Sequence, residues 1–263
     1  MPVRPDTEAL NAVAAVARAA GEKIMAVYRT DFAVESKGDD SPVTAADRAA
    51  EDLILDALAD PLGMGFPVVG EESFADGRVP DVRGTPFWLV DPLDGTKEFV
   101  KRNGEFTVNI ALIADGSPAL GVVYAPVLDQ MFGAVEGHAF AEFPDRPHRA
   151  IRSRAAPAAG LVALISRSHM TPEAEDILKN YKIAERVTAG SSLKFCRVAE
   201  GVADIYPRVG RTMEWDTAAG HAVLGFAGGR VVDLKGRDIV YGKSGFENPP
   251  FVALGANVPF PKG

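Results

Sequence analysis

The chain has 263 residues, of which 47% are hydrophobic and 24% are charged, and its formal net charge is −8 at pH 7. These values are typical of a soluble globular protein with a sizeable core, and the acidic balance argues against general binding to nucleic-acid polymers. A single cysteine excludes an internal disulfide framework or a cysteine-based zinc site, and the lack of an apolar leader or a run of transmembrane length indicates a cytoplasmic protein.

The first part of the chain predicts two amphipathic helices. Apolar residues recur at three- and four-residue spacing from Thr7 to about Tyr28, and Thr7 can cap this helix. A loop of turn-forming residues, 36–42, precedes a second helix that is expected to begin at Thr44. Asp47 lies three residues after Thr44, at a capping-box position. Two interpretations of Asp47 stay open: it satisfies backbone donors at the helix start, or it belongs to a functional site.

Two short apolar runs in the next part of the chain end in acidic residues. Residues 66–70 predict a strand that stops at Glu71. Residues 87–90 predict a buried strand that is followed by Asp91 and Asp94. Strand ends at one rim of a sheet commonly build a binding site, so these three acids are candidate site residues.

The segment from Asp91 to Thr96 carries the densest polar chemistry in the sequence. Pro92 lacks a backbone donor, so the strand is expected to end there and its two aspartates to lie on a tight turn. The carboxylates of Asp91 and Asp94 and the Leu93 carbonyl could then converge, and hard cations such as Mg²⁺ take oxygen ligands of this kind. A short helix from Thr96 would present free N–H groups suited to a phosphate. The alternative is an ordinary polar turn.

The middle of the chain predicts an antiparallel meander. Strand-like runs occupy residues 106–114, 119–124, 130–135 and 139–143, with a longer hairpin loop expected at 115–118 and a turn at 136–137. Residues 144–160 are rich in proline, arginine and alanine. They are the predicted boundary between an N-terminal α+β part, 1–150, and a C-terminal α/β part, 151–263.

Strands alternate with short helices in the second half, which indicates α/β structure. Strands are predicted at 161–165, 185–188 and 203–206, helices at 172–180 and after residue 190, and short strands in the C-terminal tail. Cys196 lies in the apolar pattern of the second of these helices, so it is expected to be a buried structural thiol. Asp216 precedes a helix of small residues, where it is either an N-cap or a site residue.

Other catalytic motifs are absent from the sequence. It contains no P-loop, no G-x-S-x-G, no G-x-G-x-x-G and no H-E-x-x-H, and its four histidines show no metal-binding spacing. The candidate functional side chains in the sequence are therefore carboxylates.

Three separated motifs stand at residues 70–73 (GEES), 88–96 (WLVDPLDGT) and 214–219 (EWDTAA). Together they resemble the inositol monophosphatase superfamily of Mg²⁺-dependent, lithium-sensitive phosphatases. Further segments are similar to the CysQ branch of that superfamily, the 3′(2′),5′-bisphosphate nucleotidases: residues 91–99, 103–112, 166–169, 190–196 and 199–206. The resemblance spans nearly the whole folded chain. It implies an α/β fold of the sugar phosphatase type, a layered αβαβα sandwich.

The resemblance also implies roles for individual residues. The implied ligands of two or three Mg²⁺ ions are Glu71, Asp91, Leu93 through its carbonyl, Asp94 and Asp216. Asp47 would pair with the Thr96 hydroxyl to activate the attacking water, and Gly95 and Thr96 would hold the scissile phosphate through backbone N–H groups. The implied substrate contacts are Glu71, Leu93, Asp94, Gly95, Thr96, His169, Ser191, Lys194, Arg208 and Asp216.

The implied substrate is a small-molecule phosphate ester, 3′-phosphoadenosine 5′-phosphate, which would lose its 3′-phosphate to give AMP. An inositol monophosphatase or fructose-bisphosphatase of the same superfamily is an open alternative, although Lys194 and Arg208 favour the nucleotide. A more distant alternative is a non-catalytic metal-dependent regulator, against which the intact metal positions argue. The preference between this substrate and its phosphosulfate relative, the choice between monomer and homodimer, and peripheral membrane association also stay open.

Overall fold

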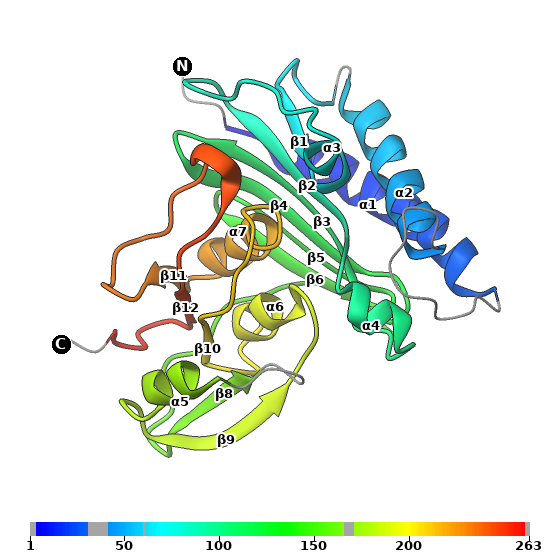
Figure 1. Ribbon diagram of the computed structural model, residues 1–263. Helices are drawn as coiled ribbons and strands as arrows, with labels where there is room; N and C mark the ends of the chain where they lie inside the picture. The colour runs from blue at the N-terminus through cyan, green and yellow to red at the C-terminus, as the bar shows by residue number, and fades with distance from the viewer. Residues whose placement is uncertain (1–3, 31–41, 60–61, 166–170, 261–263) are drawn as a thin grey trace.

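Two long amphipathic helices cover the outer face of the first of two β-sheets. The computed structural model describes residues 4–30, 42–59, 62–165 and 171–260. Helices α1 (Thr7–Tyr28) and α2 (Pro42–Ala59) pack against each other and against this sheet (Figure 1). One face of α1 is apolar because its buried residues recur at helical spacing, at Leu10, Val13, Ala17, Ala20 and Ile24.

The first sheet has seven strands within the described residues, in the order β1-β2-β3-β4-β5-β6-β7. The pair β1–β2 is parallel and the other neighbouring pairs are antiparallel, which confirms the predicted meander. Short helices α3 (Glu71–Ala75) and α4 (Thr96–Val100) follow β1 and β2 directly. The strands are β1 (Val68–Gly70), β2 (Phe87–Asp94), β3 (Thr107–Ala114), β4 (Ser117–Ala125), β5 (Gln130–Val135), β6 (His138–Phe143) and β7 (Arg146–Ala150).

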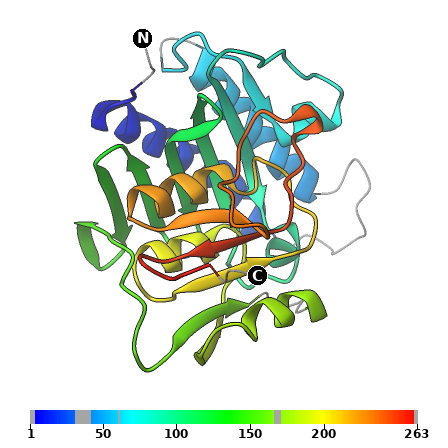
Figure 2. The same ribbon diagram turned by 90° about the vertical axis from the view of Figure 1, so that its left-hand side faces the viewer.

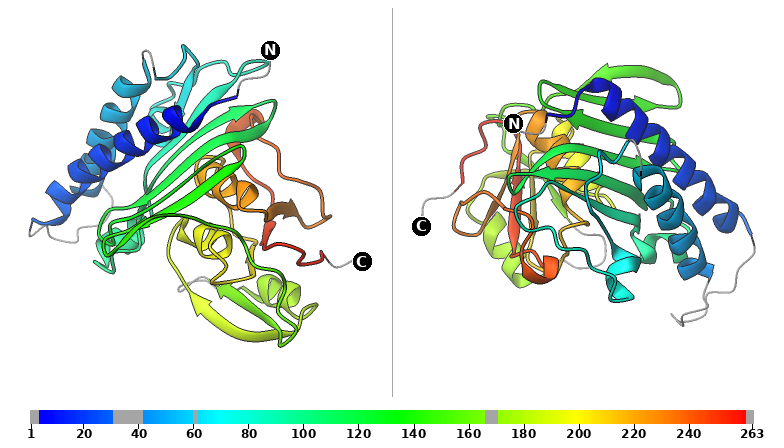
Figure 3. Two further views of the ribbon diagram at one scale, coloured as in Figure 1. Left: turned by 180° about the vertical axis from the view of Figure 1, so that it is seen from behind. Right: turned by 90° about the horizontal axis from the view of Figure 1, so that it is seen from above.

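The second sheet lies beyond α6 (Leu193–Ala199) and α7 (Ala218–Phe226), which separate it from the first (Figures 2 and 3). Its order is β11-β12-β10-β8-β9, with β8 parallel to both of its neighbours and β12 antiparallel to both of its own. Its predicted strands are present with ends shifted by two residues or fewer. The elements are β8 (Leu161–Ile165), α5 (Pro172–Leu178), β9 (Ile183–Thr188), β10 (Ile205–Arg208), β11 (Arg230–Asp233), the 3₁₀ turn η1 (Ser244–Phe246) and β12 (Phe251–Leu254).

The layers therefore follow the order helices, sheet, helices, sheet, helix. Because both faces of the first sheet are covered, β2 and β3 are buried along nearly their whole length. One core lies between this sheet and α1–α2, and a second lies between the two sheets around α6 and α7. Cys196 is fully buried in the second core, as predicted. No helix in the described ranges combines the length and apolarity needed to cross a bilayer.

The first two helices differ from the prediction at their N-termini. Asp6, rather than Thr7, caps α1, since its carboxylate accepts a backbone N–H of the first turn at 2.9 Å. The second helix begins at Pro42 rather than Thr44, because proline suits the first helical position, where its missing N–H costs nothing. Asp47 therefore lies in the second turn, beyond the capping-box position.

The predicted end of β2 at Pro92 is wrong. The strand pairs with β3 as far as Asp94, and a register shift between Asp91 and Asp94 places Pro92 in a β-bulge. A bulge tolerates proline because its extra residue is not paired in the ladder. The two aspartates therefore lie on a bulged strand and not on a tight turn.

Two further predictions about the first sheet need correction. The β3–β4 loop has only two residues, Asp115 and Gly116, whose φ angles of 51° and 72° suit a type I′ turn rather than the longer loop expected. Strand β7 lies inside the segment predicted as a boundary, because a polar edge strand carries little apolar signal. The second sheet starts at β8, and the division into 1–150 and 151–263 stays a prediction.

Candidate metal centre and active site

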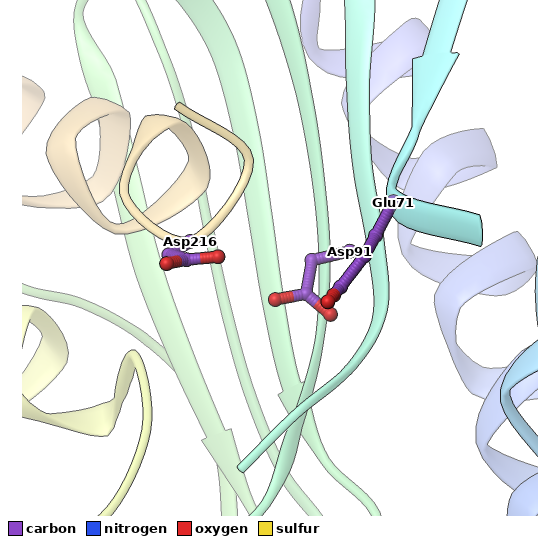
Figure 4. Close-up of side chains that lie close together, drawn as sticks. All are labelled: Glu71, Asp91 and Asp216. Atoms are coloured by element: carbon purple, nitrogen blue, oxygen red, sulfur yellow. The ribbon is translucent and has the colours of Figure 1, made fainter. Parts of the chain in front are cut away.

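Three carboxylates meet at the rim of the first sheet, beside the start of α7. Glu71, Asp91 and Asp216 each place a carboxylate oxygen within 4.8 Å of the other two. In Figure 4 the carboxylate of Asp91 lies between those of Glu71 and Asp216. Asp91 is 1% exposed and the other two are half-buried, so the cluster is largely shielded from solvent. The structure thus brings together three of the residues that the sequence predicts to be metal ligands.

Strand pairing explains why Glu71 and Asp91 are neighbours. Strands β1 and β2 are parallel, with Gly70 opposite Val90. Glu71 begins α3 directly after β1, while Asp91 continues β2, so the two acids lie at the same end of adjacent strands. Asp216 comes from a distant part of the chain, immediately before α7, which packs on β3, β4 and β5 of the same sheet.

The bulge in β2 brings Leu93 and Asp94 into the same region. The Leu93 N–H donates to Asp91 Oδ1 at 3.1 Å, which orients the Asp91 carboxylate. Asp94 is held from the side of α6, because Ser191 Oγ donates to its backbone carbonyl at 2.8 Å and Ser192 Oγ donates to its Oδ2 at 3.1 Å. Asp94 lies close enough to the cluster for its charge to raise the pKa of Asp91.

Ser192 is a residue of this site that the sequence prediction missed. Its hydroxyl lies 3.1 Å from Asp94 Oδ2 and 2.9 Å from the backbone oxygen of Asp216, and it accepts the Asn109 Nδ2–H at 2.9 Å. Ser192 is 1% exposed. It therefore links two acids that are far apart in the sequence. The G-S-S triplet gave no sign of this contact, because serine before a helix is also an ordinary cap.

Asp216 is held by its own turn and by the loop between β11 and β12. Its Oδ2 accepts the Met213 N–H at 2.9 Å, and the N-cap of α7 is Thr217, so the N-cap interpretation of Asp216 is wrong. Glu214 is fully buried and accepts both the N–H and the ammonium group of Lys243, at 3.0 and 2.6 Å. This contact anchors the segment that carries Asp216, a role for Glu214 that the motif alone did not indicate.

Burial and mutual repulsion make the three-carboxylate cluster suited to a cation. Burial, and then the charges of neighbouring acids, Glu71 foremost, raise the pKa of Asp91 well above its ordinary value. Burial and the charge of Asp94 raise the pKa of Asp216 to about 8. Carboxylate oxygens are the ligands that hard divalent cations take, and such an ion would remove the repulsion. The residues present therefore fit a divalent metal ion.

The metal-free protein is expected to lose stability as the pH rises from about 4 to about 8. The pKa of Asp216 rises from 3.8 to about 8 on folding, so the folded state holds this proton more tightly than the unfolded chain does. The stability that this proton contributes is complete below the pKa of the unfolded chain and is lost as the pH passes through the pKa of the folded state. Thermal unfolding of wild type and of Asp216→Asn, both in a chelator, measures this loss of stability. The variant should lose less stability over this window, and identical pH profiles would contradict the assignment.

Gly95 and Thr96 form the junction between β2 and α4. Gly95 has a φ of 96°, which favours glycine, and a Cβ there would lie 2.1 Å from Ser191 Oγ. Thr96 is the first residue of α4, so its N–H is among those that a helix cannot pair internally. The backbone here lies close to Ser191, just before α6, and the N–H groups at the start of α4 point out of the helix.

Asp47 lies on α2, which packs against both β2 and α4. Its side chain is buried, and its charge contributes to the raised pKa of Asp91, so Asp47 lies near the cluster. Because α2 begins at Pro42, the capping-box interpretation of Asp47 is wrong. A role in the site stays a prediction.

Lys194 and Arg208 place positive charge beside the acids. Lys194 is buried, which lowers its pKa to about 8, although the charge of Asp94 opposes this shift. Arg208 carries a buried Nε with no hydrogen-bond partner among the described residues, and its charge acts on the pKa of Asp216. His169, the remaining predicted contact with the nucleotide, lies outside the described residues.

The fold is a layered α/β fold, and a cluster of carboxylates lies at the rim of its first sheet. These two features define a class of proteins that can hold a divalent metal ion at the rim of that sheet. The profile of the inositol monophosphatase family matches residues 6–255 of this chain. The chain therefore belongs to the inositol monophosphatase family. This family is metal-dependent, and the cluster described above could bind the metal.

Individual relatives agree with this assignment over nearly their whole length. The 3′(2′),5′-bisphosphate nucleotidase CysQ of Escherichia coli is 48% identical over 246 residues, which cover 92% of this chain and 98% of the relative. The protein of the same name from Salmonella typhimurium is 49% identical over 248 residues, with the same coverage of 92% and 98%. The crystal structure of CysQ from Bacteroides thetaiotaomicron has a TM-score of 0.79 and 40% identity, covering 95% of this chain and 98% of that chain. These matches confirm the predicted family and the predicted fold class.

Proposed function

We propose that this protein is a Mg²⁺-dependent 3′(2′),5′-bisphosphate nucleotidase that removes the 3′-phosphate of 3′-phosphoadenosine 5′-phosphate, giving AMP and phosphate. The observation that supports this most strongly is the cluster of Glu71, Asp91 and Asp216 in a chain 48% identical to a relative of that name. Relatives of such identity and coverage favour a shared activity.

The acidic residues supply the metal ligands in this proposal. We assign two or three Mg²⁺ ions to the carboxylates of Glu71, Asp91, Asp94 and Asp216 and to the Leu93 carbonyl. Bound Mg²⁺ supplies charge neutralisation for the phosphate and lowers the pKa of water. The assignment also explains how a protein of net charge −8 accepts an anionic substrate, since the site's own carboxylates are neutralised.

Gly95, Thr96 and Asp47 carry the reaction itself. The N–H groups of Gly95 and Thr96 hold the scissile phosphate, at the start of α4 where the helix leaves donors unpaired. The Thr96 hydroxyl takes a proton from the attacking water and passes its own to Asp47, because a free hydroxyl is a poor base near neutral pH. The water oxygen bonds to phosphorus as the bond to the 3′-oxygen breaks; the leaving oxygen takes a proton from solvent water, and Asp47 afterwards returns the proton it received to solvent.

Positive charge near Asp94 and Asp216 selects the nucleotide in this proposal. Lys194 and Arg208 both act electrostatically on the acids, and the Nε of Arg208, which has no hydrogen-bond partner in the part of the chain that the structure describes, offers a donor to an anion. Together with Ser191 and His169, we assign them to the nucleotide end of the substrate. A cytoplasmic location, peripheral membrane association and the choice between monomer and homodimer stay predictions.

A parallel assay of three phosphate esters tests the proposed function. Phosphate release is measured from 3′-phosphoadenosine 5′-phosphate, inositol 1-phosphate and fructose 1,6-bisphosphate, with Mg²⁺ and Li⁺ titrated. We expect kcat/KM to be higher for the nucleotide by about tenfold or more, since one charge-assisted hydrogen bond contributes roughly 1.5–3 kcal/mol. Release should require Mg²⁺ and fall with Li⁺. A preference for inositol phosphate would place the protein in another branch of the family, and no release from any ester would favour a non-catalytic role.

A further inference from the structure

A buried carboxylate on α2 holds the first turn of α3, where Glu71 is located. Glu51 is 2% exposed. Its Oε2 accepts the Glu72 N–H at 2.9 Å, and its Oε1 accepts the Ser73 N–H at 2.8 Å and the Ser73 hydroxyl at 2.6 Å. The N-cap of α3 is Gly70, which has no side chain to accept these donors. Glu51 therefore performs the capping function for a helix that is separate from its own.

We infer that Glu51 is a positioning residue for Glu71 and that it sets the affinity of the acidic cluster for its divalent metal ion. This inference rests on the proposed function, because it takes Glu71 to be a metal ligand. Glu71 is the first residue of α3, so the direction of its side chain depends on where the first turn of that helix sits. Glu51 fixes that turn through three hydrogen bonds, which are strengthened by its charge.

Glu51 does not itself belong to the group of ligands. The oxygens that lie within 4.8 Å of one another come from Glu71, Asp91 and Asp216. Both carboxylate oxygens of Glu51 are already engaged with donors of α3. Its influence on the metal must therefore act through the placement of Glu71.

Gly70 offers an independent sign of how tightly this contact is packed. A Cβ at position 70 would lie 2.5 Å from both Cδ and Oε2 of Glu51, closer than real Cβ contacts. The backbone of Gly70, with φ −102° and ψ 154°, is an ordinary extended conformation that alanine adopts without strain. The carboxylate of Glu51 is thus what makes alanine unsuitable at this position. Gly70→Ala should displace Glu51 from α3 and reproduce the loss of its carboxylate.

A double-mutant cycle tests the inference. Mg²⁺ binding to metal-free wild type, Glu51→Ala, Gly70→Ala and the double variant is measured by isothermal titration calorimetry, without substrate. Loss of a residue that orients a metal ligand weakens metal affinity by about 10–100-fold, and we expect each single variant to fall in this range. The double variant should bind no more weakly than Glu51→Ala, because the collision has been removed. At saturating Mg²⁺ the variants should recover most of the wild-type rate of phosphate release.

Several outcomes would overturn the inference. If Glu51→Ala lowers the midpoint of thermal unfolding but binds Mg²⁺ as wild type does, Glu51 is only structural. Additive effects in the cycle would show that Gly70 and Glu51 act separately. Should Glu51→Ala not fold, Glu51→Gln retains the size of the side chain and one acceptor, and wild-type affinity in that variant would equally reject the inference.

A control separates metal affinity from helix capping in general. Asp6→Ala removes the cap of α1, a contact of 2.9 Å outside the acidic cluster, and should lower thermal stability without changing Mg²⁺ affinity. The proposed function is tested separately by phosphate release from wild type. A wild-type protein whose Mg²⁺ binding depends on Glu51 but which releases no phosphate would overturn the proposed function and support the inference.

Discussion

Replacing Asp94 by asparagine is expected to remove most phosphate release while the protein stays folded. The substitution keeps the shape of the side chain, and an amide oxygen can still accept the Ser192 hydroxyl, which lies 3.1 Å from Asp94 Oδ2. It removes one negative charge from the proposed metal ligands. Because loss of a group that merely orients a ligand costs about 10–100-fold, we expect loss of a ligand's charge to lower kcat/KM by about a hundredfold or more. Steady-state phosphate release at increasing Mg²⁺ measures the effect.

Asp94→Asn should also make the metal-free protein more stable near neutral pH. Burial raises the pKa of Asp94 although Lys194 and Ser192 act against the shift, so the charged form is disfavoured in the folded protein. Asp115→Asn is the matched control: it makes the same chemical change in an exposed turn, where asparagine suits the φ of 51°. That variant should retain wild-type activity. Full activity of Asp94→Asn at saturating Mg²⁺ would reject Asp94 as a ligand.

Hydrophobic spacing predicted most of the helices and strands, because it reports which face of an element is buried, whereas the layered arrangement was implied by the resemblance to the family. The 22-residue helix α1 and the apolar strand β3 are long, regular segments, and both are found where the pattern indicates. The ends of elements were less predictable. Pro92 signals the end of a strand, yet pairing with β3 resumes at Asp94 beyond a bulge, and a bulge depends on the partner strand. Strand β7 is polar because it lies at an edge, so its sequence resembles a linker.

The site was predictable to the extent that motifs place acids at element ends. The two apolar runs predicted acids at the ends of two strands, and Glu71 does follow β1, although Asp91 lies within β2; the parallel pairing of β1 with β2 makes the two acids neighbours. The residues that hold these acids were missed, because their roles arise from contacts between distant segments. Ser192 and Asn109 are 83 residues apart and form one hydrogen bond. The role of Glu51 could have been suspected from the sequence, because Glu51 lies on the buried face of α2 and a buried charge needs a hydrogen-bonding partner.

Replacing Asp47 by asparagine is expected to lower turnover far more than metal affinity. In the proposed mechanism Asp47 receives a proton through Thr96, and an amide cannot take that proton. General-base catalysis contributes about 10²–10⁴-fold, so we expect kcat to fall by a factor in this range. Mg²⁺ affinity should change little, because Asp47 is a proton acceptor and not one of the proposed metal ligands. Rates at saturating Mg²⁺ and calorimetric Mg²⁺ binding separate the two effects.

If Asp47 and Thr96 relay the proton together, substitutions of the two residues should have non-additive effects on kcat, because residues that act as a unit do. Thr96→Val should lower kcat about as much as Asp47→Asn, and the double variant should be no slower than either. Asp52→Asn is the matched control, because it changes an exposed acid on the same helix and should leave kcat unchanged. Multiplicative effects of Asp47→Asn and Thr96→Val would mean that the two residues act separately. If Asp47→Asn loses only thermal stability, Asp47 is a structural residue of α2 and the water is activated without it.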